Sequence, residues 1–496
     1  MKTSEDLKQI LERIDHRGYP AYKDTRGAYQ FGTYILGIDH VQGDPFAAPS
    51  RLHIQVAGRA ARIPGNLYDS KCKKMAVADY LLRNFAKQLE RYSFQAHGSG
   101  KSGIIQVTRC GQEVLERTAC EIEEKTGNII VRFEVGFPAR GRTIQAGELI
   151  KILYQYLPAC VEKALYYKNM DQNAVKRAAE LAVDQEYIRE QLKKEGLIAF
   201  VADGSILPRE SGVSQRPMKD AVPFVSPDSM KVTMKLPYKG VLTGMGIRKG
   251  ITLVVGGGYH GKSTLLKALE SGVYPHIAGD GREYVVTDDT AMKIRAEDGR
   301  SIRHTDISMF INDLPNKKDT VNFFTEDASG STSQAANVVE AVQSGAKCLL
   351  IDEDTCATNF MVRDELMQAV VSGEQEPITP FTLQAGNLYQ KQGISIILVA
   401  GSSGSYFYIA DHVLQMDNYR TYDITEKVKT VIGEKSETGE KKVPVDVAVL
   451  FDKDHHRSLK AGKMEKKRDQ VKIKQFGKDS FSIGRENVDL KYVEQI

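Results

Sequence analysis

The sequence has few cysteines, no long apolar run and little excess charge, and each shortage excludes a class of protein. The 496 residues include six cysteines, none of them in a CxxC pair, which is typical of a reducing compartment rather than of a disulfide scaffold. No run of about 18 apolar residues occurs, which argues against a membrane-spanning helix. The first residues are charged throughout and contain no apolar core, so they do not predict a secretory signal. We therefore expect no membrane domain, and a location in the cytoplasm or an organelle matrix.

The charge balance does not by itself indicate a nucleic-acid partner. The chain has 68 basic and 64 acidic residues, a net charge of +4, so any basic surface must be argued locally. Hydrophobic residues make up 41% and charged residues 27% of the sequence, which is the composition of a globular protein rather than of a disordered or collagen-like chain. At about 100–200 residues per domain, the length predicts about three domains.

Residues 1–200 are expected to form an α+β domain. Helical periodicity begins at Ser4, which we assign as an N-cap. Residues 146–194 are almost free of Gly and Pro and predict two or three helices. The other expected elements are helices over 4–14 and 76–91 and strands over 29–41, 51–57, 104–109 and 129–135.

A connection rich in Pro and Gly, residues 201–229, leads into an α/β core over residues 230–433. The core strands are near-continuous apolar runs, as expected of strands buried on both faces, at 251–255, 284–286, 348–352 and 394–400.

Residues 434–496 are expected to form a small C-terminal domain. It opens with the polar stretch EKSETGEKK, a linker or hairpin, and its segment 457–474 contains eight basic and two acidic residues. That segment is either a solvated stretch or an electrostatic arm for nucleic acid. The last residues, VDLKYVEQI, resemble the start of a helix, which suggests a chain that continues.

The strongest local signal is a phosphate-binding loop that matches GxxxxGK[ST]. The strand ITLVV precedes it and the helical stretch STLLKALE follows it. Backbone N–H groups of such a loop turn toward phosphate oxygens, and the following helix adds its N-terminal partial charge. Lys262 would reach the β- and γ-phosphates and Ser263 would bind Mg²⁺. The alternative is a tight glycine turn with a chance lysine. The expected nucleotide-binding residues are Gly256, Gly257, Gly258, Tyr259, His260, Gly261, Lys262, Ser263 and Thr264.

Two acidic residues end the apolar run CLLID, at the edge where open α/β sheets place ligand groups. Asp352 is expected to hold Mg²⁺. Glu353 follows directly, and a carboxylate in this position can orient and polarise an attacking water. Two solvated acids at a strand end are the alternative. A phosphate-binding loop in the same chain favours the catalytic assignment, since phosphoryl transfer needs metal and water on one edge. Glu353 and Lys262 are thus the expected catalytic residues.

A serine-rich helix start lies between these motifs, in the segment ASGSTSQ. Ser329, Gly330 and Ser331 would contribute a hydroxyl and free N–H groups at a helix N-terminus, which together make an anion site. Ser329 lies 23 residues before Asp352, the spacing between the signature segment and the Walker B strand of ABC-class ATPases. In those proteins the signature binds nucleotide held by the other protomer, so the resemblance implies a homodimer. The alternative is a plain Ser/Thr N-cap.

Several positions depart from the ABC pattern. No His follows the strand ISIILVA; the sequence there is GSSGS, so Ser402 or Ser403 is the expected replacement for the switch residue. Asn312 lies in the region of the usual Q-loop Gln and is assigned to the nucleotide site. An upstream turn, Gly98 to Ser102, resembles half of a P-loop, but a strand rather than a helix follows it. It is therefore either a turn or a secondary anion contact.

Longer motifs make the resemblance to ABC-class ATPases more specific. GGGYHGKSTLL, TEDASGSTSQAAN and LLIDEDTCATNFMVRD together resemble the soluble predicted ATPases of the ABC class. That family combines an N-terminal domain, an ABC core and a C-terminal domain, and the resemblance covers essentially the full chain. It implies a ring-shaped homodimer without transporter domains. One branch of the family is tied to mitochondrial RNA processing, so the resemblance also suggests a nucleic-acid partner.

The N-terminal domain carries residues suited to single-stranded nucleic acid. The loop 40–51 is rich in turn formers and contains an aromatic residue, Phe46. Basic residues interleaved with aromatics bind phosphates and stack on bases; the alternative is a solvated surface with core tyrosines. The residues considered are Arg26, Tyr29, Lys101, Arg109, Arg140 and Arg142.

The sequence thus predicts a Mg²⁺-dependent ATPase that dimerises around two ATP molecules and acts on a nucleic acid, with single-stranded RNA as the expected partner. One alternative is an ATP-gated nucleic-acid clamp with little turnover, which the missing switch His favours. A protein scaffold without nucleic acid is another. A transporter subunit is the least favoured, because such subunits rarely carry two large flanking domains.

Overall fold

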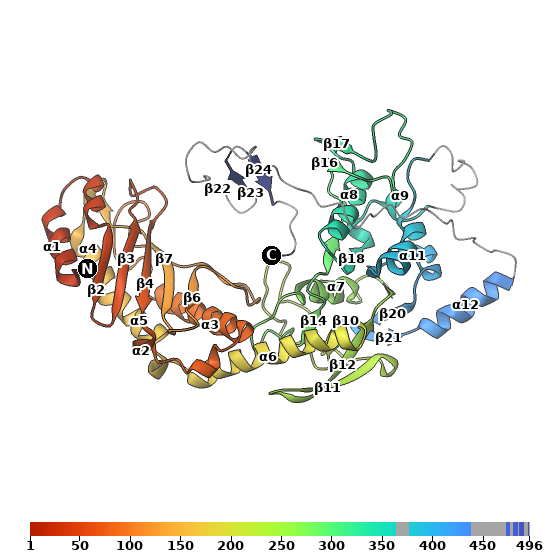
Figure 1. Ribbon diagram of the computed structural model, residues 1–496, viewed down its shortest axis with the longest axis horizontal. Coiled ribbons are helices and arrows are strands. Elements are labelled where there is room, and N and C mark those ends of the chain that lie inside the picture. The colour runs from red at the N-terminus through yellow and green to blue at the C-terminus, as the bar shows by residue number, and fades with distance from the viewer. Residues whose placement is uncertain (364–375, 438–472, 477–479, 485, 491–494, 496) are drawn as a thin grey trace.

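The computed structural model describes residues 1–363, 376–437, 473–476, 480–484, 486–490 and 495. The N-terminal domain and the α/β core lie at opposite ends of the molecule, and the long helix α6 (Gln172–Lys194) runs between them (Figure 1). Within the described residues, no helix combines the length and the apolar character needed to cross a membrane.

The N-terminal domain is built on one seven-stranded sheet. Burial alternates along its central strands, so one face packs into the core and the other is polar. Helices supply the rest of this core: α1 (Ser4–Ile14), α3 (Lys71–Glu90), α4 (Ala146–Lys151) and α5 (Leu157–Leu165). The strands are β1 (Lys2–Thr3), β2 (Gly27–Phe31), β3 (Tyr34–His40), β4 (Ser50–Val56), β5 (Ile105–Gln106), β6 (Cys120–Ile122) and β7 (Ile129–Val135).

Local details of this domain differ from the prediction. Thr3, rather than Ser4, caps α1, because its hydroxyl accepts from the Asp6 N–H at 3.2 Å while the Asp6 carboxylate accepts from the Thr3 N–H at 2.7 Å. The strand expected over 29–41 is a hairpin, since Gly32 adopts a φ of 55° in a tight turn between β2 and β3. The strand expected over 104–109 is limited to β5.

Helix α6 joins the two parts of the chain. It packs on α3 at one end and on β10 (Leu197–Ala202) toward the other. β10 belongs to a four-stranded antiparallel sheet with β11 (Lys231–Leu236), β12 (Gly240–Arg248) and β14 (Val285–Thr287), in the order β11-β12-β10-β14. The boundary expected at residue 200 therefore falls inside a strand whose partners belong to the core.

The α/β core has a six-stranded sheet that is parallel except for the edge strand β21. Alternate residues of β19 enter two separate cores: Ile396 packs under α8 (Gly330–Gln343) and α11 (Phe381–Gln392), and Ile397 packs under α7 (Lys262–Ser271). The sheet is thus covered on both faces, as its apolar strands predict. The strand order is β15 (Met292–Ile294), β18 (Cys348–Asp352), β19 (Ser395–Val399), β13 (Ile251–Val255), β20 (His412–Asp417) and β21 (Arg420–Asp423).

The C-terminal part contains helix α12 (Thr425–Glu437) and three antiparallel strands, β22 (Ile473–Phe476), β23 (Ser480–Ile483) and β24 (Glu486–Asp489). The prediction of a helix over VDLKYVEQI, residues 488–496, is wrong for its first two residues, because Val488 and Asp489 lie in β24. The polar stretch that begins at Glu434 starts inside α12. Residues 457–472 of the basic segment lie outside the described residues.

Candidate nucleotide site

The glycine-rich loop connects β13 to α7, so the strand and the helix expected on its two sides are both present. Gly256 and Gly261 have φ values of 146° and 100°, in the region that favours glycine. A Cβ atom on Gly256 would lie 2.3 Å from the Met416 carbonyl oxygen, and one on Gly261 would lie 2.8 Å from the Tyr419 ring. Glycine is therefore required at both positions by close packing as well as by conformation.

Lys262 is the first residue of α7, and its side chain turns back over the loop. Its Nζ donates to the carbonyl oxygens of Gly256 at 2.8 Å and Gly257 at 2.9 Å. The ammonium group therefore lies within the loop, where phosphate oxygens would replace the carbonyls as acceptors. Ser263 and Thr264 follow in the first helical turn. Tyr259 is fully exposed.

A turn between β20 and β21 supports the loop, and the sequence did not identify it. His260 Nδ1 accepts from the Asn418 N–H at 2.9 Å, and the His260 carbonyl accepts from the Tyr419 N–H at 3.1 Å. Asn418 and Tyr419 have positive φ values of 48° and 64°. Two adjacent non-glycine residues in this region are uncommon, but no sequence pattern announces them.

The two acidic residues lie at the carboxyl end of β18. Asp352 is buried, and its Oδ1 accepts from the Asp354 N–H at 3.3 Å. Only β19 separates β18 from β13 in the sheet, so Asp352 and the start of α7 lie on the same edge. A carboxylate from β18 and the Ser263 hydroxyl are the hard oxygen ligands that Mg²⁺ prefers. The residues present therefore fit a nucleotide–magnesium site.

Glu353 is held by the loop that follows β19. Its Oε2 accepts from the N–H groups of Gly401 at 2.8 Å and Ser402 at 3.1 Å, and its Oε1 accepts from the Ser402 hydroxyl at 2.6 Å. The Ser403 hydroxyl instead accepts from the Ser405 N–H. Of the two serines considered as replacements for the switch His, Ser402 is the one that contacts Glu353.

The same loop also lies beside the lysine of the P-loop. A Cβ atom on Gly401 would lie 3.7 Å from Lys262 Nζ. Tyr406 lies fully buried in the core close to Glu353, and its hydroxyl has no hydrogen-bond partner among the described residues. Its burial, and then the charge of Glu353, raise its pKa, so the phenol stays neutral.

The serine-rich segment opens α8 as expected, with Ser329 at the N-cap. The Ser329 hydroxyl lies 3.0 Å from that of Thr332. Ser331 is buried, and its hydroxyl donates to Asn359 Oδ1 at 2.9 Å on α9 (Thr358–Met361). Ser331 thus joins α8 to α9 rather than presenting its hydroxyl to a ligand. In the described residues, the hydrogen bonds of Ser329 and Ser331 share no residue with those of the P-loop.

Asn312 does not join this group of residues. Its side-chain Nδ2 donates to the Ser308 carbonyl at 2.6 Å, and its backbone N–H donates to the Pro377 carbonyl at 2.9 Å. These bonds fasten its segment to residues 377–378, where Ile311 also bridges Ile378. The amide therefore serves local structure, and the structure does not bring it to the loop.

The upstream turn, Gly98 to Ser102, makes hydrogen bonds within the N-terminal domain. The Ser99 N–H donates to the Ala139 carbonyl at 2.7 Å, the Lys101 N–H donates to the Pro45 carbonyl at 2.8 Å, and the Ser102 hydroxyl donates to the Ser99 carbonyl at 2.6 Å. These donors are already used within the domain, which favours the turn over the anion contact. Tyr29 is fully buried, with its hydroxyl bonded to the Thr25 carbonyl, so it cannot stack on a base.

Together, a glycine loop with its lysine, two carboxylates on a nearby parallel strand and a serine-capped helix define a P-loop nucleotide-binding protein of the ABC type. Residues 171–450 match the P-loop domain of the ABC_ATPase family, and residues 4–168 match the N-terminal domain of ATPases of the ABC class. The chain belongs to this family of ABC-class ATPases.

One curated relative is an uncharacterized protein of Methanocaldococcus jannaschii, MJ1628, which is 30% identical over 221 residues, 43% of this chain and 49% of that protein. The match therefore spans about half the length of this relative. Among solved structures, CbiO1 from Clostridium perfringens, part of the ABC transporter complex cbiONQ, is 14% identical, with a TM-score of 0.30 over 49% of this chain and 93% of that one. MJ1267, an ATP-binding cassette of an ABC transporter in its ADP conformation, is 12% identical, with a TM-score of 0.29 over 49% and 99%.

Proposed function

We propose that this chain binds ATP with Mg²⁺ and hydrolyses it, and that it does so as a homodimer. The observation that carries the proposal is the convergence on one sheet edge of Lys262, from the start of α7, and of Asp352 and Glu353, from the carboxyl end of β18. Lys262 binds phosphate oxygens, and Ser263 with Asp352 supplies the metal ligands. When bound, Mg²⁺ neutralises charge on the phosphates. Glu353 accepts a proton from the attacking water.

Support for the homodimer comes from two segments that make separate hydrogen bonds within one chain. The hydrogen bonds of Ser329 join it to the start of α8, and those of the P-loop join it to the β20–β21 turn. A second copy that presents its α8 N-terminus to the P-loop would complete a site for the γ-phosphate. Because each site would use residues from both copies, an experiment that mixes two inactive variants can test the homodimer.

Mixing two inactive variants is expected to restore hydrolysis. Lys262→Ala removes the P-loop cation and Ser329→Arg blocks the helix start, so each homodimer has two defective sites. In the mixed dimer, both defects fall in one site and the other site is intact. The measurement is phosphate release as the mixing ratio varies, with each variant alone as the control. Mixtures that stay at the level of the separate variants would contradict a site shared between copies.

Ser402→Ala is expected to lower kcat with little change in KM. The lost hydroxyl bond orients Glu353, which acts on water rather than on ATP binding, and a hydrogen bond to a charged group contributes about 1.5–3 kcal/mol. We expect a decrease in kcat of about 10-fold or more and a KM within about twofold. Ser403→Ala is the matched control, because its hydroxyl bonds to Ser405 instead.

The second candidate function is an ATP-gated clamp with little turnover, and one observation favours it. Both carboxylate oxygens of Glu353 are engaged by the 401–402 loop, so the loop would have to release Glu353 before it acts on water. If the chain is such a clamp, Ser402→Ala raises kcat. The sign of the change in steady-state hydrolysis therefore separates the ATPase from the clamp.

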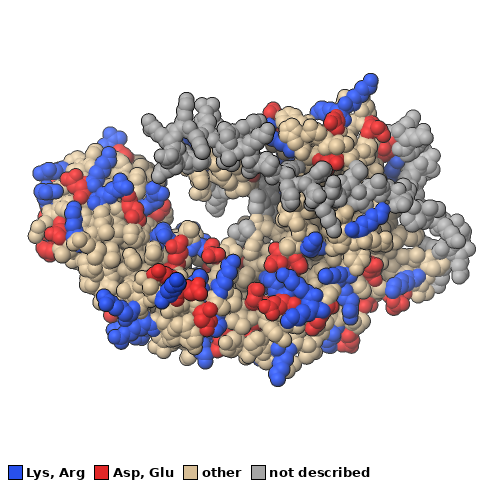
Figure 2. Space-filling model, in the orientation of Figure 1, with Lys and Arg blue, Asp and Glu red and all other residues tan. Residues whose placement is uncertain are grey.

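Single-stranded RNA is the partner that we propose for the N-terminal domain. Phe46 and Phe94 are 63% and 62% exposed, and they flank the turn that carries Lys101. Arg140 and Arg142 are exposed close by, although Arg142 pairs with Asp44 at 2.8 Å. Exposed aromatic rings among cations suit base stacking and phosphate contacts. Figure 2 shows acidic and basic side chains interspersed on the face that it displays, so the contact would be local.

The test of this partner is binding of a single-stranded oligoribonucleotide by fluorescence anisotropy at several salt concentrations. Phe46→Ala with Phe94→Ala is expected to weaken binding by about 10-fold or more, at about 1–3 kcal/mol per stacked base. Oligoribonucleotide binding that changes neither with salt nor with these substitutions would place the RNA-binding surface elsewhere.

A further inference from the structure

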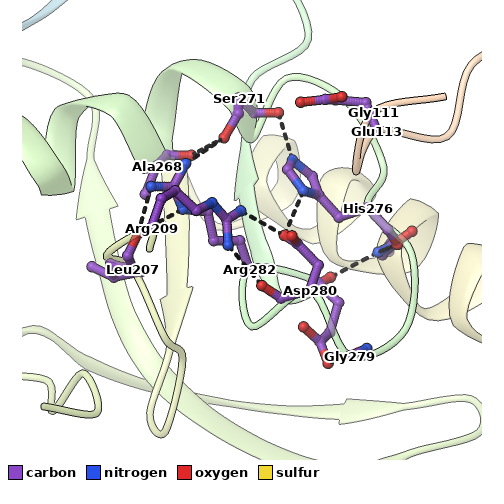
Figure 3. A network of polar contacts seen from close by, with 12 residues as sticks. Gly111, Glu113, Leu207, Arg209, Ala268, Ser271, His276, Gly279, Asp280 and Arg282 are labelled. Atoms are coloured by element: carbon purple, nitrogen blue, oxygen red, sulfur yellow. Dashed lines mark hydrogen bonds and ion pairs between the residues drawn. The ribbon is translucent and has the colours of Figure 1, made fainter. Parts of the chain in front are cut away.

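The C-terminal end of the P-loop helix α7 is held by an arginine and a histidine from outside the helix (Figure 3). Arg282 Nη1 donates to the Ser271 hydroxyl at 3.2 Å and to the Lys267 carbonyl at 3.4 Å. His276 Nε2 lies 3.0 Å from the Ser271 carbonyl oxygen. Positive charge at this end complements the helix dipole. Lys262 begins the same helix, about 15 Å away at 1.5 Å per residue.

His276 is held through both of its ring nitrogens. Its Nε2 faces a carbonyl oxygen, so Nε2 must carry the proton. Its Nδ1 lies 2.8 Å from Asp280 Oδ2, and the same carboxylate oxygen accepts from Arg209 at 2.8 Å. Both ring nitrogens thus face oxygen atoms, and the Asp280 carboxylate joins His276 to Arg209. Burial lowers the pKa of Arg282 to about 10, with Arg209 adding to the effect, so Arg282 stays charged near neutral pH.

Helix α6 reaches the same place from the other side. Arg189 donates to the carbonyl of Thr287 and, at 3.4 Å, to that of Gly272 at the end of α7. Gln185 Nε2 donates to the carbonyl of His276 at 2.9 Å. Both side chains are buried. Because α6 also packs on α3 of the N-terminal domain, it connects that domain rigidly to the end of the P-loop helix.

The N-terminal domain makes a second, direct contact. Val114 N–H donates to the Pro275 carbonyl at 2.8 Å, and Ile277 N–H donates to the Gln112 carbonyl at 3.0 Å. Between these bonds, Glu113 inserts a buried carboxylate beside the cationic cluster (Figure 3). Its Oε2 has no hydrogen-bond partner among the described residues, and neither has Oδ1 of Asp280. Spare acceptors beside buried donors allow a second arrangement of the cluster.

We propose that Arg189, His276 and Arg282 position the C-terminal end of the P-loop helix and transmit nucleotide binding to the N-terminal domain. A phosphate at Lys262 pulls on one end of a rigid helix, and the cluster at the other end moves with it. Val114 and Glu113 then follow, since they are bonded to or packed on the segment directly after α7. The proposal rests on the proposed function in one respect, namely that nucleotide binds at Lys262.

The test is amide hydrogen exchange of the full chain with and without a non-hydrolysable ATP analogue. Amide exchange at Val114 and Ile277 is expected to slow by about fivefold or more when the analogue binds. Fivefold is the lower end of the range typical of coupling between two sites. In Arg282→Lys, which keeps the charge but loses the fork whose Nη1 meets α7 while Nε meets the Leu207 carbonyl at 2.9 Å, this response is lost and KM for ATP rises by about fivefold with kcat nearly unchanged. Arg13→Lys, an exposed position on α1, is the control.

A second pair of variants guards against a folding defect. Glu113→Gln replaces a carboxylate whose Oε2 has no partner, and Glu116→Gln is its exposed control in the same segment. Only Glu113→Gln is expected to change the exchange response at Val114. If the wild type binds no nucleotide, the proposed function fails. If it binds nucleotide while exchange at Val114 and Ile277 stays constant, or if the variants change thermal stability alone, the positioning role is overturned.

Discussion

Lys262→Ala is expected to abolish nucleotide binding at working concentrations. The Nζ atom is the only ammonium group bonded into the loop in the described structure, at 2.8 and 2.9 Å from its carbonyls. Each charge-assisted bond that it would make to phosphate contributes about 1.5–3 kcal/mol, so losing two weakens binding on the order of 10²-fold or more. The measurement is equilibrium titration with a fluorescent ATP analogue in the presence of Mg²⁺.

The matched control for this variant lies on the same helix. Lys267 has an exposed side chain, and its backbone carbonyl, which Arg282 contacts, is unchanged by substitution. Lys267→Ala is therefore expected to bind nucleotide as the wild type does. Equal affinity of Lys262→Ala and Lys267→Ala, with both chains folded, would remove the basis for the nucleotide site.

Local sequence signals predicted the parts of the site that depend on local conformation. The P-loop needs glycines at positive φ between a buried strand and a helix, and Gly256 and Gly261 supply them. Ser329 was likewise predictable, since serine is preferred at the N-cap position that it occupies, although its hydroxyl lies against that of Thr332 rather than capping the backbone. Asp352 could be predicted because a carboxylate that ends a buried apolar strand lies at the sheet edge where ligands bind.

Contacts between distant segments could not be predicted from the sequence. Ser402 meets Glu353 across 49 residues only because β19 lies beside β18, and no pattern fixes that order in advance. The cluster around His276 draws side chains from four separate segments, which contribute Glu113, Arg189, Arg209 and the stretch from Ser271 to Arg282. Residue type left open whether Tyr29 stacks on a base or packs in the core, and its burial in β2 favours the core. The assignment of Asn312 to the nucleotide site stays a prediction, although its backbone N–H bonds to Pro377.

Glu353→Gln is expected to bind ATP but to hydrolyse it about 10²- to 10⁴-fold more slowly, the usual contribution of a general base. The amide oxygen can still accept from the Gly401 N–H, and the Ser402 hydroxyl can rotate to accept from the amide N–H. The loop contact is thus kept while the basic oxygen is lost, so fold and affinity should change little. Phosphate release and analogue binding, measured on the same preparation, check both parts.

The oligomeric state of Glu353→Gln tests the proposed homodimer. If ATP joins two copies through Lys262 of one and Ser329 of the other, a chain that binds without hydrolysis should accumulate as a dimer when ATP and Mg²⁺ are present. Size-exclusion chromatography with light scattering measures this directly. Asp354→Asn, an exposed neighbouring acid, should hydrolyse normally and dimerise only transiently. Hydrolysis by Glu353→Gln at the wild-type rate would move the catalytic base elsewhere, and a monomeric Glu353→Gln with bound ATP would reject the shared site.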